Sequence, residues 1–337
     1  MTAVRDLPAS APTAETGPPL LDVRSLRTEF KTHGGPLVAV NDISFTLARG
    51  RVLAVLGESG SGKSAMLRTI LGIQPKSARI SGQVLMDGED LLTMEPRRRE
   101  RIRGRWLSMI FQDPMTALDP LFTVERQIVE TIRRHQAISA REASVRALGL
   151  LKLVQIPSPE RRLKAYPFEL SGGMRQRVVI AIALACNPSL LLADEPTTAL
   201  DVTVQARVLE LLRDLRARLG MGIIIVTHDL AVAAEIADDV AVMYAGRIVE
   251  FGTVRDIVRH PAHPYTRGLL EANIRPRQDT RPEAIPGAPP NLSQIGIGCA
   301  FAPRCSRASE ECTNETPGFF RVGHDHQARC YLVASGG

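Results

Sequence analysis

The segment Gly57–Ser64, with the sequence GESGSGKS, has the residue types and the spacing of a phosphate-binding loop. Its glycines allow consecutive backbone N–H groups to turn toward a polyphosphate, and the helix that follows points the positive end of its dipole at the same place. Lys63 would contact the terminal phosphates, and the Ser64 hydroxyl would hold Mg²⁺. The candidate phosphate contacts are Gly57, Ser59, Gly60, Ser61, Gly62, Lys63 and Ser64.

A second pair of candidate functional residues, Asp194 and Glu195, directly follows the apolar run Leu190–Ala193. Asp194 is placed to hold Mg²⁺ through water, and Glu195 is placed to orient and polarise an attacking water as a general base. Two acids at a strand end are common by themselves. Their position about 130 residues after a phosphate loop makes nucleotide hydrolysis the favoured function.

Buried strands must deliver these groups. Val52–Leu56 leads into the phosphate loop, Leu190–Ala193 into the two acids, and Gly222–Val226 into His228. Leu20–Phe30 and Val38–Leu47 alternate as antiparallel strands do, whereas the region from about 115 to 175 has helical periodicity and ends where Ser171 can cap a new helix. The pattern predicts an α/β fold: a nucleotide-binding core with an antiparallel β subdomain and a helical subdomain.

The order of the motifs resembles the nucleotide-binding subunit of an ABC transporter over about residues 20–255. The motifs are GESGSGKS, Gln112, LSGGMRQR, LLLADEP, Ala199-Leu200-Asp201 and His228. The resemblance implies that ATP is the substrate, that Gln112 contacts Mg²⁺ and the attacking water, that His228 contacts the γ-phosphate, and that Asp201 lies at a dimer interface. Mg²⁺ would be held by Ser64, Gln112 and Asp194, and adenine would stack on Phe30 or, alternatively, His33.

The resemblance also implies a site shared between two chains. Ser171, Gly172 and Gly173 open a second helix suited to a γ-phosphate. The family's geometry places them far from the phosphate loop of the same chain, so they would complete the site of a partner. A second ABC ATPase subunit is therefore expected, and a homologous but different chain is favoured.

The C-terminal sequence resembles that of dipeptide and oligopeptide importer ATPases, on the segments His260–Thr266 and Gly298–Cys305. We accordingly divide the chain into a disordered leader (1–19), an ABC ATPase domain (20–255) and a C-terminal extension (256–337). The implied function is the ATPase of a peptide-class importer on the cytoplasmic face of the membrane. Its partners would be two transmembrane permease subunits and an external solute-binding protein.

Four cysteines gather near the end of the chain, at Cys299, Cys305, Cys312 and Cys330. Four thiolates can ligate a [4Fe–4S] cluster or a tetrahedral zinc ion. The wide gaps between the cysteines and their apolar neighbours favour the iron–sulfur cluster, which would stabilise a small Cys-ligated extension. Zinc, uncoordinated thiols and disulfides are the alternatives.

Composition narrows the function classes. No run approaches the roughly 18 apolar residues of a membrane span, so the permeases must be other chains. Importers of nickel or glutathione that use the same type of ATPase are alternatives. A soluble ABC ATPase that acts on nucleic acid or ribosomes is a further alternative. Members of that class that act in repair carry a long coiled-coil insertion, and the 58 residues between Gln112 and Ser171 leave no room for one. We expect no nucleic-acid partner.

Overall fold

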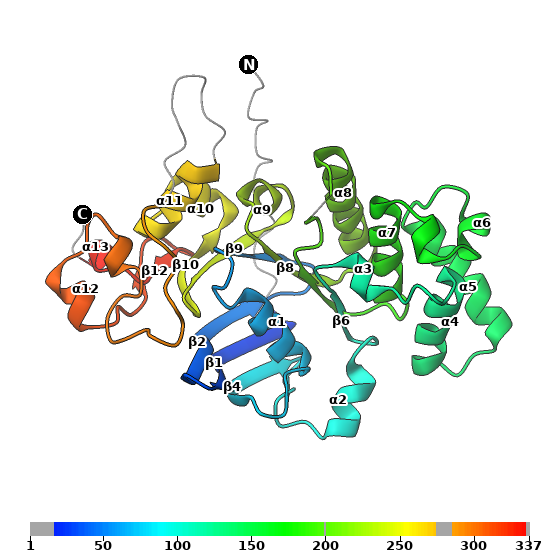
Figure 1. Cartoon of the computed structure of the whole chain (residues 1–337), viewed down its shortest axis with the longest axis horizontal. Helices are drawn as coiled ribbons and strands as arrows, with labels where there is room; N and C mark the ends of the chain where they lie inside the picture. The colour runs from blue at the N-terminus through cyan, green and yellow to red at the C-terminus, as the bar shows by residue number, and fades with distance from the viewer. Residues whose placement is uncertain (1–16, 199, 274–284, 335–337) are drawn as a thin grey trace, which may run out of the picture.

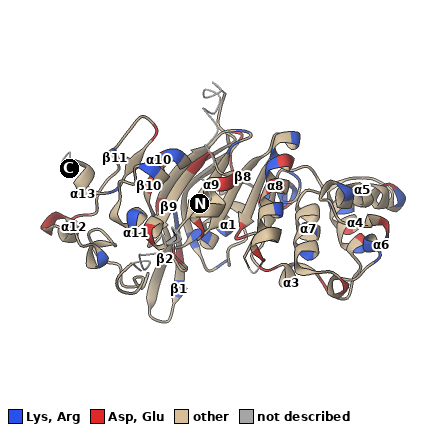
Figure 2. Ribbon diagram, turned by 90° about the horizontal axis from the view of Figure 1, so that it is seen from above, with Lys and Arg blue, Asp and Glu red and all other residues tan. Residues whose placement is uncertain are grey.

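The structure is a computed structural model, and it describes residues 17–198, 200–273 and 285–334. The predicted leader lies almost wholly outside the described residues, as does Ala199. The molecule is elongated, with two sheets near its middle, a group of helices at one end and the C-terminal segments at the other (Figure 1). Basic and acidic residues are interspersed at both ends (Figure 2).

An eight-stranded sheet forms the centre of the molecule. Its strand order is β11 (Phe320–Arg321), β12 (Gln327–Ala328), β10 (Arg247–Thr253), β9 (Asp239–Tyr244), β3 (Val52–Leu56), β8 (Gly222–Thr227), β7 (Leu190–Asp194) and β6 (Leu107–Ile110). The five strands from β9 to β6 run parallel, and β10 and β12 continue the sheet in antiparallel pairing. The parallel strands are nearly continuous apolar runs because helices and a second sheet cover both faces.

Alternate residues of these strands enter two different cores. Val52, Ala54 and Leu56 of β3 pack on one face, while Leu53 and Val55 pack on the other. The second face is covered by α1 (Lys63–Leu71) and by a four-stranded antiparallel sheet, ordered β2 (Gly35–Leu47), β1 (Leu21–Thr32), β4 (Arg79–Met86) and β5 (Glu89–Asp90). The short helix α2 (Pro96–Ile102) follows this sheet.

The first face is covered by helices. The subdomain between β6 and β7 holds α3 (Pro114–Ala117), α4 (Val124–His135), α5 (Ala140–Leu153), α6 (Pro159–Leu163), the 3₁₀ turn η1 (Pro167–Glu169) and α7 (Gly172–Ala183). Beyond it come α8 (Val202–Leu219) and α9 (Leu230–Ile236). Ser171 caps α7 by accepting a hydrogen bond from the N–H of Met174, as predicted. The predicted combination of α/β core, antiparallel β subdomain and helical subdomain is present.

The C-terminal residues are attached to the edge of the central sheet. After α10 (Val254–Arg259) and α11 (Pro264–Asn273), the described chain resumes at residue 285 and forms η2 (Ala302–Arg304), α12 (Glu310–Asn314), β11, β12 and α13 (Tyr331–Ala334). β12 pairs with β10 through Glu250 opposite Ala328 and Phe251 opposite Gln327. We call residues 256–337 the extension and keep the predicted boundary as a proposal.

A buried carboxylate holds the extension to the sheet. Glu250 of β10 has no exposed surface and accepts hydrogen bonds from the backbone N–H groups of Ala262 and His263, at 2.7 and 2.9 Å. Nε2 of His326 lies 2.7 Å from its Oε1 and donates to it, because a carboxylate only accepts. Burial alone would raise the pKa of Glu250, but these bonds outweigh it and hold the pKa below its usual value.

We predict that Glu250→Gln destabilises the extension in a pH-dependent way. A lowered folded pKa stabilises the protein fully above the unfolded value of about 4.3, and this contribution disappears as the pH falls through the folded pKa. Urea unfolding at pH 7 should show a loss of about 2 kcal/mol or more, and the difference from wild type should shrink only as the pH falls below about 4. Glu271→Gln is the control, because the Glu271 side chain on α11 is exposed. An equal difference at pH 7 and at about pH 3 would contradict the assignment.

Candidate active site

The phosphate loop is packed between two backbone segments. It connects β3 with α1, and Gly62 has a φ of +101°. A Cβ on Gly62 would overlap the carbonyl oxygen of Ala39 on β2 and lie 2.8 Å from Cε of Met243 on β9. The Ser61 carbonyl accepts a hydrogen bond from the N–H of Gly246, at 2.9 Å. The loop conformation therefore depends on glycine at position 62 and on the β9–β10 turn.

Lys63 is positioned by the loop itself. Its Nζ donates to the carbonyl oxygens of Gly57 and Glu58 at 2.7 and 2.8 Å. Burial lowers the pKa of Lys63, and the nearby carboxylates of Glu195, Asp194 and Glu58 act in the opposite direction. The N–H groups of Gly62, Lys63 and Ser64 stand at the start of α1, where a helix leaves its donors free for an anion.

A candidate Mg²⁺ site lies beside the loop. The Ser64 hydroxyl donates to Oδ1 of Asp194 at 2.8 Å, so the two predicted ligands, from α1 and from the end of β7, are adjacent. Asp194 is almost fully buried, and this burial raises its pKa against the opposing effects of Ser64 and Arg68. Hydroxyl and carboxylate oxygens are the hard ligands that Mg²⁺ prefers, so these residues fit the ion.

The three predicted catalytic side chains meet at one carboxylate. Oε2 of Glu195 lies 3.3 Å from Nε2 of Gln112 and 3.4 Å from Nδ1 of His228, and it accepts a 2.8 Å hydrogen bond from the Thr198 hydroxyl. Gln112 follows β6 and His228 follows β8, so the ends of neighbouring strands supply these groups. Thr198 was not among the predicted site residues, although its position three residues after Glu195 could have indicated it.

Other predicted residues lie apart from this centre. Ser171, Gly172 and Gly173 start α7, which packs against α3, α4 and α5 of the helical subdomain and against α8 (Figure 1). Within the described ranges, no hydrogen bond or ion pair joins them to the phosphate loop. Asp201 caps α8 by accepting from the N–H of Val204 and is exposed. Phe30 is half-buried on β1 and His33 is exposed in the following turn, so the adenine contact stays a prediction.

The predicted metal centre of the extension needs correction. Cys299, Cys305, Cys312 and Cys330 are free thiols that line one small apolar cavity. Among the residues that the structure describes, however, no group of three or more His, Cys, Asp or Glu could hold a metal ion. Burial raises the pKa of Cys299 to about 11 and also raises that of Cys330. The [4Fe–4S] cluster and the Cys-ligated extension are therefore not supported. Sequence spacing cannot show whether sulfur atoms converge with the geometry that a metal requires.

The comparisons with known proteins agree with this fold and site. Residues 40–198 match the ABC transporter family, and residues 249–312 match the family described as the oligopeptide/dipeptide transporter C-terminal region. A dimeric ATP-binding cassette, solved in a post-hydrolysis state with ADP and phosphate, superposes with a TM-score of 0.63 at 28% identity, over 70% of this chain and 99% of that one. The fold and the site thus define an ABC ATPase, which hydrolyses ATP.

Similarity along nearly the whole chain narrows the family further. The oligopeptide transport ATP-binding protein OppD of Bacillus subtilis is 47% identical over 318 residues, which are 93% of this chain and 89% of that protein. The OppD protein of Haemophilus influenzae is 44% identical over 94% of this chain and 98% of its own length. This chain belongs to the family of oligopeptide transport ATP-binding proteins.

We predict that Gly62→Ala weakens nucleotide binding without unfolding the protein. The added Cβ meets backbone at Ala39, so the loop must move, and the phosphate contacts are lost with it. Calorimetric titration with MgADP should show binding weakened by at least about tenfold. Gly88→Ala is the matched control, since its φ of +84° carries the same backbone strain but its Cβ would meet nothing within 4 Å. Unchanged MgADP affinity in Gly62→Ala would refute the prediction.

Proposed function

We propose that this chain is the ATP-hydrolysing subunit that energises a peptide importer. The observation that carries the proposal is the match to oligopeptide transport ATP-binding proteins across both the cassette and the extension. The relatives' names favour peptides over nickel or glutathione as the solute, and they favour transport over action on nucleic acid or ribosomes. Within the described residues, no helix is long and apolar enough to cross a bilayer. Separate permease chains and an external binding protein would therefore complete the importer at the cytoplasmic membrane face.

The hydrolytic step follows from the carboxylate centre. Glu195 accepts a proton from the attacking water as the γ-phosphate bond breaks, and Gln112 and His228 orient that water and the phosphate. Lys63 and the free N–H groups at the start of α1 stabilise the charge that develops on the phosphate oxygens. Ser64, Asp194 and Gln112 would hold Mg²⁺, which supplies further charge neutralisation when bound.

We predict that Glu195→Gln stops hydrolysis while sparing ATP binding. The amide keeps the size of the side chain but cannot accept the proton, so kcat should fall by at least ~100-fold. Turnover would be measured in the assembled transporter, and binding would be measured by titration of the isolated chain. Glu210→Gln on the exposed face of α8 is the matched control. Turnover that survives the Glu195 substitution would rule out the general-base role.

A second cassette would complete each site. Ser171, Gly172 and Gly173 form a helix start that the chain's own phosphate loop does not use. The related cassette was solved as a dimer, which supports pairing of the same kind here. Asp201 and the 71% exposed Val202 would lie in the shared interface. We favour a homologous, different chain as the partner.

One surface of the helical subdomain, formed by α3 and by the segments before α4 and around η1, is the proposed contact with the permeases. Its exposed apolar side chains include Met115 (59% exposed), Leu121 (77%) and Phe168 (69%). The N–H of Val124 donates to the carbonyl of Ala165 at 3.0 Å, which places the segments before α4 and before η1 side by side. Gln112 precedes this surface by only a few residues, so a permease contact there would reach the carboxylate centre directly.

We predict that Leu121→Asp prevents assembly with the permease subunits. A charge in an apolar contact must be desolvated, which weakens association by at least about tenfold. Val145→Asp is the control, because Val145 on α5 is also exposed (68%) and lies outside the proposed contact. Co-purification from detergent-solubilised membranes provides the measurement. Equal recovery of permease with the two variants would argue against this surface.

A further inference from the structure

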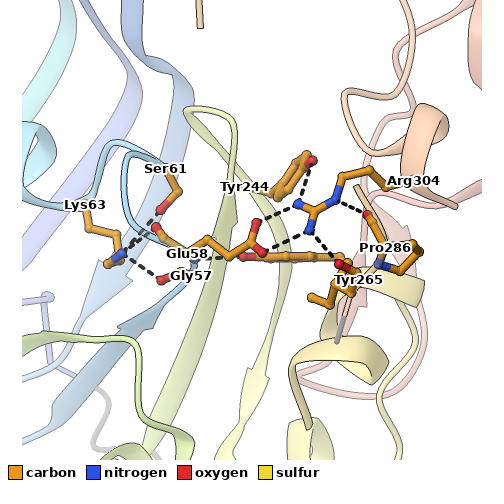
Figure 3. A network of polar contacts seen from close by, with 9 residues as sticks. Gly57, Glu58, Ser61, Lys63, Tyr244, Tyr265, Pro286 and Arg304 are labelled. Atoms are coloured by element: carbon orange, nitrogen blue, oxygen red, sulfur yellow. Dashed lines mark hydrogen bonds and ion pairs between the residues drawn. The ribbon is translucent and has the colours of Figure 1, made fainter. Parts of the chain in front are cut away.

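The extension contacts the phosphate loop through an ion pair between residues 246 positions apart. Nη1 of Arg304 donates to Oε2 of Glu58 at 2.7 Å, and Nη2 donates to Oε1 at 3.1 Å (Figure 3). Glu58 is the second residue of the GESGSGKS loop, and Arg304 lies in η2. The Arg304 side chain is only 6% exposed and that of Glu58 is 24% exposed. A bidentate, largely buried pair is among the stronger charge interactions in proteins.

Arg304 is held in place by the rest of its surroundings. Its Nε donates to the carbonyl of Pro286 at 2.8 Å, and Nη2 lies 3.3 Å from that of Ile285. Its guanidinium also lies 5.9 Å from the ring centres of Tyr244 and Phe301. The bond with Glu58 is the largest cause that raises the pKa of Arg304. Contacts outside the phosphate loop therefore also hold the guanidinium in position.

A second contact holds the backbone of the same loop residue. The N–H of Glu58 donates to the Tyr265 hydroxyl at 2.8 Å. Tyr265, on α11, is fully buried and packs against Tyr244 and Phe301, with ring centres 4.5 and 5.4 Å apart. The extension therefore fixes both the main chain and the side chain of Glu58, while Lys63 holds its carbonyl (Figure 3).

Because Glu58 is negatively charged, its pairing with Arg304 affects how the loop binds a nucleotide. A carboxylate within a loop that receives a polyphosphate repels the ligand, and Glu58 is close enough to Lys63 to influence the pKa of the lysine. Figure 3 shows the Glu58 carboxylate directed toward Arg304, on the opposite side from Lys63. The guanidinium neutralises the carboxylate and keeps it away from the lysine that binds phosphate.

We propose that Arg304 is a positioning residue for ATP binding: it neutralises and orients Glu58, so that the extension sets the affinity of the phosphate loop. The inference rests on the proposed function only in that the loop binds ATP. Transport and the pairing of two cassettes play no part in it.

The test is a charge cycle on the full-length chain. Affinities for MgADP and for the non-hydrolysable ATP analogue AMP-PNP with Mg²⁺ are measured by calorimetry for wild type, Arg304→Gln, Glu58→Gln and the double variant. Arg304→Gln frees the carboxylate and should weaken binding about tenfold, more for AMP-PNP than for MgADP because the extra phosphate carries more charge. The deficit should shrink in high salt.

The double variant separates charge from structure. Glu58→Gln alone leaves a cation near the loop and should tighten binding, and the double variant should return to within about twofold of wild type. Arg307→Gln is the matched control, because Arg307 is exposed in the same segment. Thermal unfolding of each variant checks that it folds.

Two results would overturn the proposal. One is an Arg304→Gln chain that binds both nucleotides as wild type does. The other is a double variant as weak as Arg304→Gln, which would make Arg304 a structural anchor whose charge is irrelevant to the nucleotide. Failure of the transport function would leave wild-type nucleotide binding intact, so the two failures are distinguishable.

Discussion

Parallel pairing of β3, β8 and β7 is the constraint on which the active site depends. Leu56 lies opposite Thr227, and Asp194 lies opposite Val226, so the three strands end together. The phosphate loop, the two acids and His228 consequently emerge at one edge of the sheet. The two faces of these strands enter two separate cores, and a slip of one residue would exchange their side chains. Burial of apolar side chains therefore sets the distances between the candidate catalytic groups.

The same edge holds a strained residue at its centre. Glu195 has a φ of +46°, a conformation that costs a residue with a side chain about 1 kcal/mol or more. Its N–H donates to the carbonyl of Val226 at 3.0 Å, so the sheet itself maintains the turn. The carboxylate then reaches Gln112, Thr198 and His228 together. A relaxed turn after Asp194 would direct the side chain elsewhere, so the strain positions the carboxylate that we propose as the general base.

Sequence reasoning was most successful where a pattern has one structural solution. Apolar runs such as Val52–Leu56 and Gly222–Val226 are strands within a residue of prediction, because a short apolar run before a glycine-rich loop or a histidine has few alternatives. The metal site predicted from the four C-terminal cysteines was wrong. The thiols lie near one cavity, but their spacing in the sequence does not fix the direction in which each sulfur points. The pairing of β12 with β10 and the contact of Arg304 with Glu58 join distant segments that have no shared motif.

The extension and the ATP site are coupled because both contact the β9–β10 hairpin, which lies between them. β10 carries Glu250, which anchors the extension, while Met243 on β9 packs on the loop glycines and Tyr244 faces Arg304. The turn of the same hairpin donates from Gly246 to the loop. A displaced extension would thus act on the loop directly at Glu58 and indirectly through the β9–β10 turn. Both routes converge on a loop in which Gly57 and Gly62 leave no room for a Cβ, so a displaced extension would displace the phosphate loop as well.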